Sequence, residues 1–293
     1  MRRRLYHLDV FTTRPFTGNP LAVVIDGDGL SVARMQAIAR EMNLSETVFV
    51  QKPTSSRALA RLRIFTVKRE LPLAGHPVIG TWHLLAELGV VPASEGAVHV
   101  WQQTGAGILP VEIEFAGGRP KRVTMTQRPA RFRPARLRLQ ALAEALGLRT
   151  ADFDPALPIE LVSTGIYNLM VPLRHRTTLR RIRHNPHALQ RLLRGRGTLA
   201  YCFAVGRRGR SFARGLLPWE QAEDPATGSA GGSLAAYLVR HRQWQVDKTL
   251  EITQGVEMRR PSRIEVRILA QNRRLVPLVS GSAVRIFEGH LEA

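Results

Sequence analysis

Two segments of the sequence share a frame of a polar residue, a proline, two variable positions, a glycine and a hydroxyl residue. They are 76–81 (HPVIGT), which begins with His76, and 224–229 (DPATGS), which begins with Asp224 and ends with Gly228 and Ser229. An apolar run follows each segment, so each predicts the start of a helix. The first N–H groups of a helix lack partners within it and, with the helix dipole, favour an anion. Both segments therefore predict a carboxylate site, with two capped core helices as the simpler alternative.

Glu46 carries a carboxylate in a β-branched and aromatic segment that predicts a strand over 44–50. Apolar surroundings raise the pKa of a carboxylate, which can then serve as a general acid or base. When the two halves of the chain are matched at Phe49 and Phe203, Ala200 stands opposite Glu46. Only one half keeps the acid, and this asymmetry indicates acid–base catalysis by Glu46. The alternative is a surface glutamate on the outer face of an alternating strand.

These residues belong to an internal repeat that covers most of the chain. Segment 17–24 (TGNPLAVV) resembles segment 164–171 (TGIYNLMV), and the two are separated, like the helix starts, by about half of the 293 residues. A repeat of this size indicates a duplicated domain, and the length suffices for two cores. We expect domains at 1–127 and 128–293, joined by a basic, proline-marked segment. The last strand, at about 284–290, could return to the first domain.

Strands dominate each half, and one apolar helix is prominent in each. The sequence therefore predicts the α+β class, with two pseudo-symmetric domains that each curl a mostly antiparallel sheet around a central helix. The first central helix is expected to end at Gly89, and the second to begin at Pro225, because proline suits the first helical turn. Further helices are expected at 31–43, 137–146 and 187–193. Strands are expected at 8–11, 21–25, 44–50, 60–66, 98–102, 107–115, 122–127, 160–163, 168–172, 199–205, 250–253, 263–269 and 284–288.

The composition is that of an ordinary globular protein, with 44% hydrophobic and 23% charged residues. Arginine supplies nearly all of the 43 basic residues, and the formal net charge is +20. Because the arginines are scattered and aromatic residues are few, specific nucleic-acid binding is disfavoured. No apolar run reaches the length of a membrane span, and the basic N-terminus lacks a signal-peptide core. We therefore expect no membrane association and a cytoplasmic location.

Motifs for metals and cofactors are missing from the sequence. The lone Cys202 excludes an intramolecular disulfide and a pair of thiolates. The histidines of segment 175–187 have no acidic cluster nearby, so no metal site is expected. The glycines from Gly228 onward lack the spacing of a phosphate loop or a dinucleotide fingerprint. We therefore expect neither a metal nor a cofactor.

Four blocks of the sequence together resemble the PhzF-like isomerase family of phenazine biosynthesis. They are 9–11 with 16–23, 43–49 (NLSETVF), 74–77 (AGHP) and 223–230 (EDPATGSA), and they run in order over most of the chain. The resemblance implies the diaminopimelate epimerase-like fold, with the site between two similar domains. It also implies a cofactor-free enzyme that is usually a homodimer.

The resemblance also implies roles for individual residues. Glu46 matches the family's acid/base, which moves a proton between carbons. The positions that match substrate contacts are His76, Asp224 and Ser229, and Gly75 and Gly228 match main-chain contributions. The related epimerases and proline racemases place cysteine thiols near the two helix starts, where this chain has none. A two-thiol racemase is therefore disfavoured.

The sequence thus predicts a cofactor-independent isomerase of a small carboxylic acid, with one glutamate as its acid/base. Two alternatives stay open: an epimerase or racemase of a small acid, and a non-catalytic protein of the same fold that binds a small acid. The chain departs from the family pattern at Leu73 and Leu216, where phenylalanine is common, and at Val67, where proline is common. Segment 218–223 is a residue short and borders the expected site, so the substrate's identity stays open.

Overall fold

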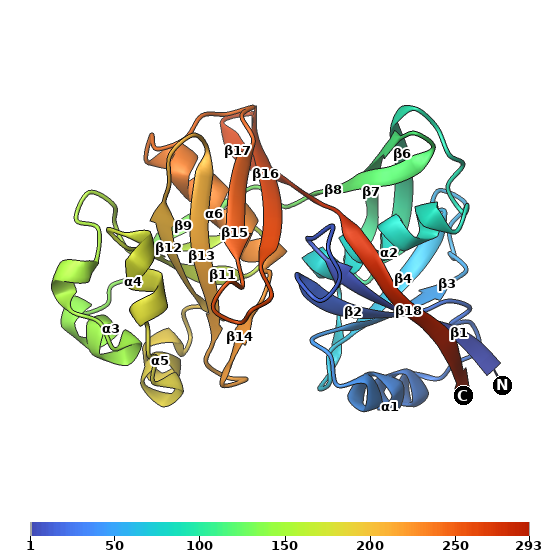
Figure 1. The fold of residues 1–293 in the computed structure, drawn as a ribbon, viewed down its shortest axis with the longest axis horizontal. Helices are drawn as coiled ribbons and strands as arrows, with labels where there is room; N and C mark the ends of the chain where they lie inside the picture. The colour runs from blue at the N-terminus through green and yellow to red at the C-terminus, as the bar shows by residue number, and fades with distance from the viewer. Residues whose placement is uncertain (1, 293) are drawn as a thin grey trace. The chain divides into compact units, whose positions relative to one another are not determined.

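Strands outnumber helices in both units into which the chain divides in the structure, a computed structural model that describes residues 2–292 (Figure 1). Unit 1 consists of Met1–Thr126 and Ser280–Ala293, and unit 2 of Gln127–Val279. The C-terminal segment belongs to unit 1 because strand β18 (Ala283–Glu292) pairs with β1 (Arg2–Val10) along its whole length. The last strand therefore returns to the first unit, a possibility that the sequence alone leaves open.

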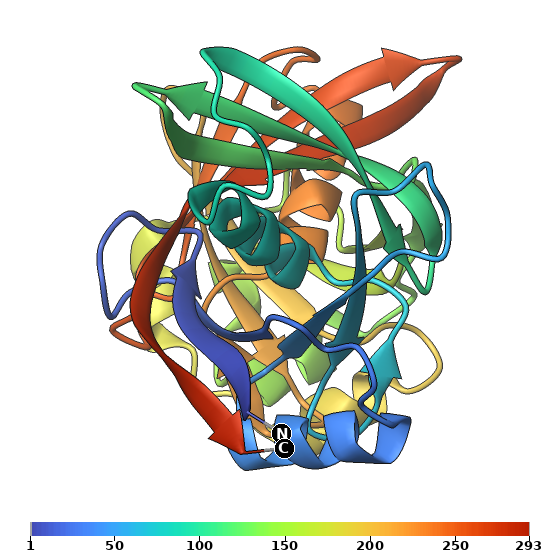
Figure 2. The same cartoon turned by 90° about the vertical axis from the view of Figure 1, so that its right-hand side faces the viewer.

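Unit 1 encloses one helix, α2 (Gly75–Glu87), in which every residue from His76 to Ala86 is buried. The other strands of the unit are β2 (Asn19–Val24), β3 (Thr47–Gln51), β4 (Ala60–Phe65), β5 (Glu70–Leu71), β6 (Gly96–Thr104), β7 (Gly107–Ala116) and β8 (Arg119–Thr126). The helix packs against β1, β2, β3, β7, β8 and β18, and Figure 2 shows it lying against the curved strands. A helix that is apolar on nearly every side needs this enclosure.

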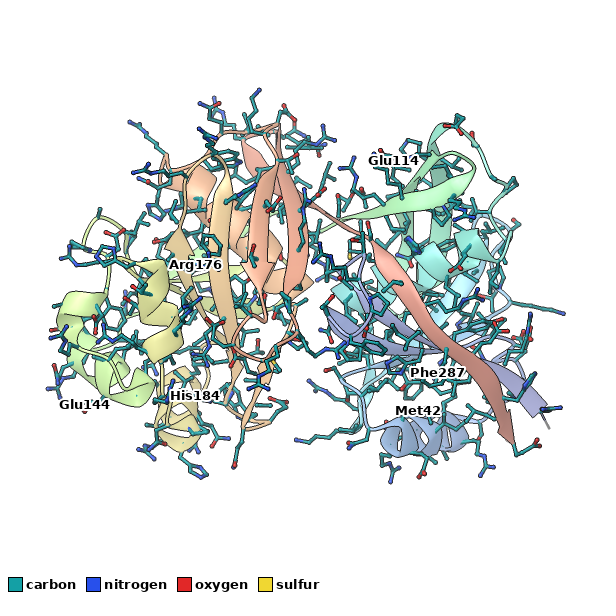
Figure 3. All side chains as sticks on the ribbon, in the orientation of Figure 1. Met42, Glu114, Glu144, Arg176, His184 and Phe287 are labelled. Carbon is teal, nitrogen blue, oxygen red and sulfur yellow. The ribbon has the colours of Figure 1, made fainter. Side chains whose placement is uncertain are left out.

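The other face of the sheet in unit 1 is covered by helix α1 (Val32–Met42). Ser31 caps its first turn, and Asn43 ends it in the left-handed conformation at φ 50°, which confirms both boundaries expected from the sequence. Met35 is fully buried in a cluster with side chains of β1 to β4. Met42, labelled in Figure 3, packs against the same cluster from the end of the helix.

Unit 2 repeats this plan around helix α6 (Gly228–Arg240), which packs against β10, β11 and β16. Its strands are β9 (Arg131–Pro134), β10 (Glu160–Ser163), β11 (Tyr167–Pro172), β12 (Ala200–Val205), β13 (Arg210–Leu217), β14 (Ala222–Asp224), β15 (Leu250–Gln254), β16 (Ser262–Gln271) and β17 (Arg274–Gly281). Three more helices form a second core with β10 to β13. They are α3 (Leu139–Leu146), α4 (Arg176–Arg181) and α5 (Pro186–Leu193).

The strand pairings occur in the same order in both units. In unit 1, β2 runs parallel to β3, β3 antiparallel to β4, β4 antiparallel to β5 and parallel to β6, and β6 antiparallel to β7. In unit 2, the same sequence of pairings joins β11, β12, β13, β14, β15 and β16. Most pairs are antiparallel. The structure therefore confirms the predicted α+β class and the duplicated plan of a sheet around a helix.

Several elements differ from the sequence-based expectation. Helix α6 begins at Gly228 and not at Pro225, because the main chain of Thr227 is extended, at φ −109° and ψ 91°, and serves as the N-cap. Strand β13 is not predicted because buried Arg214 interrupts its apolar pattern. Arg214 is accommodated by Glu223 at 2.8 Å, a partner that local sequence does not reveal. Strands β5, β9, β14 and β17 and helix α4 are also missing from the prediction.

Candidate active site

Glu46 and His76 lie next to each other in unit 1. Glu46 directly precedes β3, so the expectation that it lies within a strand is wrong. Its Oε2 atom is 3.4 Å from Nε2 of His76, and the two side chains are 16% and 7% exposed. Because a side chain this enclosed does not belong to the outer surface, the alternative of a surface glutamate is also wrong.

His76 is neutral in the folded protein. Burial lowers its pKa to about 3, and a hydrogen bond with the main chain of Pro20 opposes this shift only in part. The side-chain Nδ2 of Asn19 lies 3.4 Å from Nδ1 of the ring. The other ring nitrogen, Nε2, faces the carboxylate of Glu46. In the tautomer that is protonated at Nε2, His76 can donate to the carboxylate without carrying a charge.

Buried neutral histidines also make unit 1 sensitive to acid. His83 lies on α2, and burial lowers its pKa to about 4. Such a group takes up a proton when the chain unfolds, so its contribution to stability is complete above the ordinary histidine pKa of about 6.5. The contribution is lost as the pH falls from there toward about 4. Folding stability should therefore fall over this pH range.

We expect the His83→Gln variant to lose less stability in acid than the wild-type protein. The free energy of unfolding should fall between pH 7 and pH 4.5 by about 2 kcal/mol less than in the wild type, because glutamine does not titrate. Urea unfolding at the two pH values measures this difference. His99→Gln is the matched control, since the side chain of His99 is 68% exposed. If the free energy of unfolding fell equally in His83→Gln and in the wild type between the two pH values, His83 would not be held neutral.

The two central helices begin alike, but not in the way the shared sequence frame predicts. Gly75 is the first residue of α2, and Gly228 is the first residue of α6. His76 and Ser229 therefore occupy equivalent second positions, whereas Asp224 ends strand β14 ahead of its helix. The predicted equivalence of His76 and Asp224 is wrong, because the shared proline lies inside α2 but before α6.

Neither central helix has a side-chain cap at its N-terminus, whereas Ser31 caps α1 and Asn185 caps α5. The main chain at the start of α6 is nevertheless held firmly. The carbonyl of Gly228 accepts from Gln127 Nε2 at 3.0 Å, and that of Ser229 accepts from Thr164 Oγ1 at 3.2 Å. The N–H groups of both helix starts, with the positive end of the dipole, suit a carboxylate.

The acid of unit 1 has no counterpart in unit 2. Strand β3 begins at Thr47, and its topological equivalent β12 begins at Ala200. The residue that precedes β12, and so corresponds to Glu46, is Leu199 rather than Ala200. The predicted asymmetry holds, although the matched residue is shifted by one position.

Asp224 is part of a hydrogen-bond network in unit 2. Its Oδ2 atom accepts from Thr227 Oγ1 at 2.7 Å, and its main-chain carbonyl accepts from Gln254 Nε2 at 2.6 Å. Sequence reasoning missed both partners. Thr227 lies in the same sequence frame as Asp224. A hydroxyl residue three positions after an acid could have indicated this hydrogen bond. Gln254 ends strand β15, and nothing in its local sequence marks it.

Cys202 lies on β12, and burial raises the pKa of its thiol to about 12. The thiol is therefore protonated at neutral pH and is a poor base. Over residues 2–292, no group of three histidine, cysteine or acidic side chains is arranged to hold a metal ion. None of the helices in the same range is both long and apolar enough to cross a lipid bilayer.

Known proteins resemble this chain over nearly its whole length. The trans-2,3-dihydro-3-hydroxyanthranilate isomerase of Pseudomonas aeruginosa is 39% identical over 286 residues, which cover 96% of each chain. A PhzF-family phenazine biosynthesis protein of Bacillus anthracis has the same fold with a TM-score of 0.90, at 28% identity and over the full length of both chains. A hydroxyproline epimerase of Agrobacterium vitis is similar in fold alone, with a TM-score of 0.70 at 15% identity, over 99% of this chain and 91% of that one.

These similarities agree with the geometry of the two units. The likeness to the epimerase confirms the predicted two-domain, diaminopimelate epimerase-like fold. The sequence also matches the family model of phenazine biosynthesis-like proteins, PhzC-PhzF, over residues 8–289. The chain therefore belongs to the PhzC-PhzF family of phenazine biosynthesis-like proteins, and it is an isomerase.

Proposed function

We propose that the protein is a cofactor-independent isomerase that moves a proton between two carbons of a small carboxylic acid, with Glu46 as its single acid/base. The observation that carries this proposal is the enclosed pair of Glu46 and His76, whose facing atoms are 3.4 Å apart. Burial holds the histidine neutral, and the equivalent position of unit 2 is the apolar Leu199. Because His76 does not take up a proton near neutral pH, the carboxylate of Glu46 is the member of the pair that can accept a proton from the substrate.

One carboxylate suffices for a proton shift of this kind. Glu46 removes the proton from a carbon that neighbouring unsaturation acidifies, and the C–H electron pair moves into the conjugated system. The resulting carboxylic acid then gives a proton to a second carbon on the same face of the substrate. One C–H bond breaks and another forms, so nothing is oxidised or reduced and Glu46 returns to its starting state. In the tautomer that is protonated at Nε2, His76 donates a hydrogen bond to the carboxylate and orients it.

The proposed substrate-binding residues are Gly75, His76, Asp224, Gly228 and Ser229. The helix starts that contain the glycines supply N–H groups to a carboxylate. Asp224, as a carboxylate, suits a donor such as an amine or a hydroxyl. The substrate named for the relative from Pseudomonas aeruginosa, trans-2,3-dihydro-3-hydroxyanthranilate, carries all three groups. We propose this compound, or a close analogue, as the first substrate to assay.

Turnover in D₂O tests the reaction type. A proton shift should give a constitutional isomer with at most one deuterium, located at the carbon that gains the proton. Incorporation should stay below one deuterium per molecule, because a single carboxylate returns part of the proton that it removed. Mass spectrometry and NMR of the product measure the amount and the position. Deuterium at the original carbon, with inverted configuration, would instead identify an epimerase.

The epimerase alternative rests on the likeness in fold to the hydroxyproline epimerase. Inversion needs two bases on opposite faces of one carbon, and the one thiol of the chain, Cys202, is buried and protonated. We therefore favour the isomerase. A small acid that raises the melting temperature without being converted would support the non-catalytic alternative. The homodimer and the cytoplasmic location expected from the sequence are also proposals.

A further inference from the structure

The side chain of Gln254 is fully buried in unit 2, and all of its hydrogen-bonding capacity is used. Its Oε1 atom accepts from the hydroxyl of Tyr201 at 2.8 Å and from the N–H of Thr227 at 3.1 Å. Its Nε2 atom donates to the main-chain carbonyl of Asp224 at 2.6 Å and to Thr227 Oγ1 at 2.9 Å. A buried amide with four partners has one orientation, since rotating it would break all four bonds.

These bonds meet at the turn that joins β14 to α6. Thr227 Oγ1 accepts from Gln254 and donates to Asp224 Oδ2 at 2.7 Å, so the orientation of the amide determines the direction of the threonine hydroxyl. That hydroxyl in turn holds the carboxylate of Asp224. The same amide fixes the residue before Gly228, the first residue of the helix. One side chain therefore controls both the carboxylate and the helix start.

The residues around the amide of Gln254 hold it in this orientation. Tyr201 is itself fully buried, and burial raises the pKa of its hydroxyl, so it stays a donor. Gly215 lies opposite, on β13. A Cβ at Gly215 would come within 2.8 Å of Thr227 Oγ1 and 2.9 Å of Gln254 Nε2. The network thus fills the space beside a strand that has no side chain at this point.

We propose that Gln254 is a positioning residue for substrate binding, which holds Asp224 and the start of α6 in the geometry that receives the polar groups of the substrate. The inference rests on the proposed binding roles of Asp224, Gly228 and Ser229. It does not depend on the role of Glu46 as the base. Gln254 acts through Asp224 and Thr227 and does not itself contact the substrate.

The Gln254→Glu variant removes the hydrogen-bond donor of the amide and keeps its acceptor. Glutamate keeps an Oε1 acceptor for Tyr201 and for the N–H of Thr227, but at pH 8 it replaces the Nε2 donor by a second acceptor. The carbonyl of Asp224 and Thr227 Oγ1 then lose their donor. The threonine hydroxyl is drawn toward the new carboxylate and away from Asp224. Substrate binding should weaken while the hydrogen bonds of Tyr201 remain.

Binding is measured in a Glu46→Gln background, where substrate is bound without being converted. We expect Gln254→Glu to raise the Kd for trans-2,3-dihydro-3-hydroxyanthranilate, measured by calorimetry, by about 10- to 100-fold. In the enzyme with Glu46 intact, KM should rise more than kcat falls. Tyr237→Phe is the matched control. Tyr237 lies on α6, and the variant removes a buried hydroxyl that donates to the main-chain carbonyl of Pro158 at 2.5 Å. This control should lower the melting temperature and leave Kd unchanged.

A second pair of variants applies if Gln254→Glu does not fold. Thr227→Ser keeps the hydroxyl that links Gln254 to Asp224, and Thr227→Val removes it at similar volume. Kd should rise in the valine variant and return close to the wild-type value in the serine variant. An unchanged Kd in Gln254→Glu, or equal Kd values in the two Thr227 variants, would overturn the positioning role. Full activity of the Glu46→Gln enzyme would instead refute the proposed function, a result distinct from either of these.

Discussion

Replacing Glu46 by glutamine is expected to lower kcat by about a thousand-fold or more with little change in folding stability. The amide keeps the shape of the side chain and a carbonyl oxygen that can accept from His76, but it cannot take a proton from carbon. A positioned acid/base contributes about 10²- to 10⁴-fold to rate, and here one group is proposed for both proton transfers. Steady-state kinetics with trans-2,3-dihydro-3-hydroxyanthranilate, together with thermal unfolding, measure both quantities.

The matched control for this variant is Glu41→Gln on the exposed face of α1. It makes the same chemical change five residues earlier in the sequence. It should leave kcat within about two-fold of the wild type, since surface substitutions of this kind rarely matter. If Glu46→Gln kept more than a tenth of wild-type kcat, another group would have to be the base. If it lost activity and also unfolded, Glu46→Asp would separate the two effects, because it keeps a carboxylate on a shorter side chain.

The fold could be predicted from sequence to the extent that it depends on local signals. Ser31 and Asn43 bound α1 through capping chemistry that four or five neighbouring residues determine. The two central helices follow from apolar runs and the internal repeat. Strand β13 could not be predicted in this way. Its buried Arg214 is tolerated because Glu223 and the main-chain carbonyl of Leu179 accept hydrogen bonds from its guanidinium group. Leu179 lies far away in sequence.

Residue types mark the candidate site in the sequence, but they do not determine its geometry. The proline frame pairs His76 with Asp224, but the proline lies inside α2 and before α6. The main chain of Thr227 is extended, at φ −109°, so α6 starts later than its proline suggests. The enclosure of Glu46 also depends on contacts that are distant in sequence. A repeat identifies the acid as unusual, but only the packing against His76 shows that its side chain is largely enclosed.

Gly255→Ala is expected to destabilise unit 2 by about 3 kcal/mol or more and to weaken substrate binding. Gly255 follows Gln254 and has a φ of +76°, a conformation that costs a residue with a Cβ about 1 kcal/mol or more. Its Cβ would also lie 2.7 Å from the main-chain carbonyl of Pro225 and would clash with that of Arg260. Because both obstacles are main-chain atoms, they cannot rotate away as side chains do.

The control that separates these two costs is Gly195→Ala in the same unit. Gly195 has a similar φ of +70°, but a Cβ there would meet nothing within 4 Å. This variant should lose only about 1 kcal/mol, which is the conformational cost alone. Urea unfolding gives both values, and equal losses would mean that the turn at Pro225 moves freely. That result would weaken the argument for Asp224 as well. The carboxylate can be held in place by Gln254 only if the main chain between Asp224 and α6 is rigid.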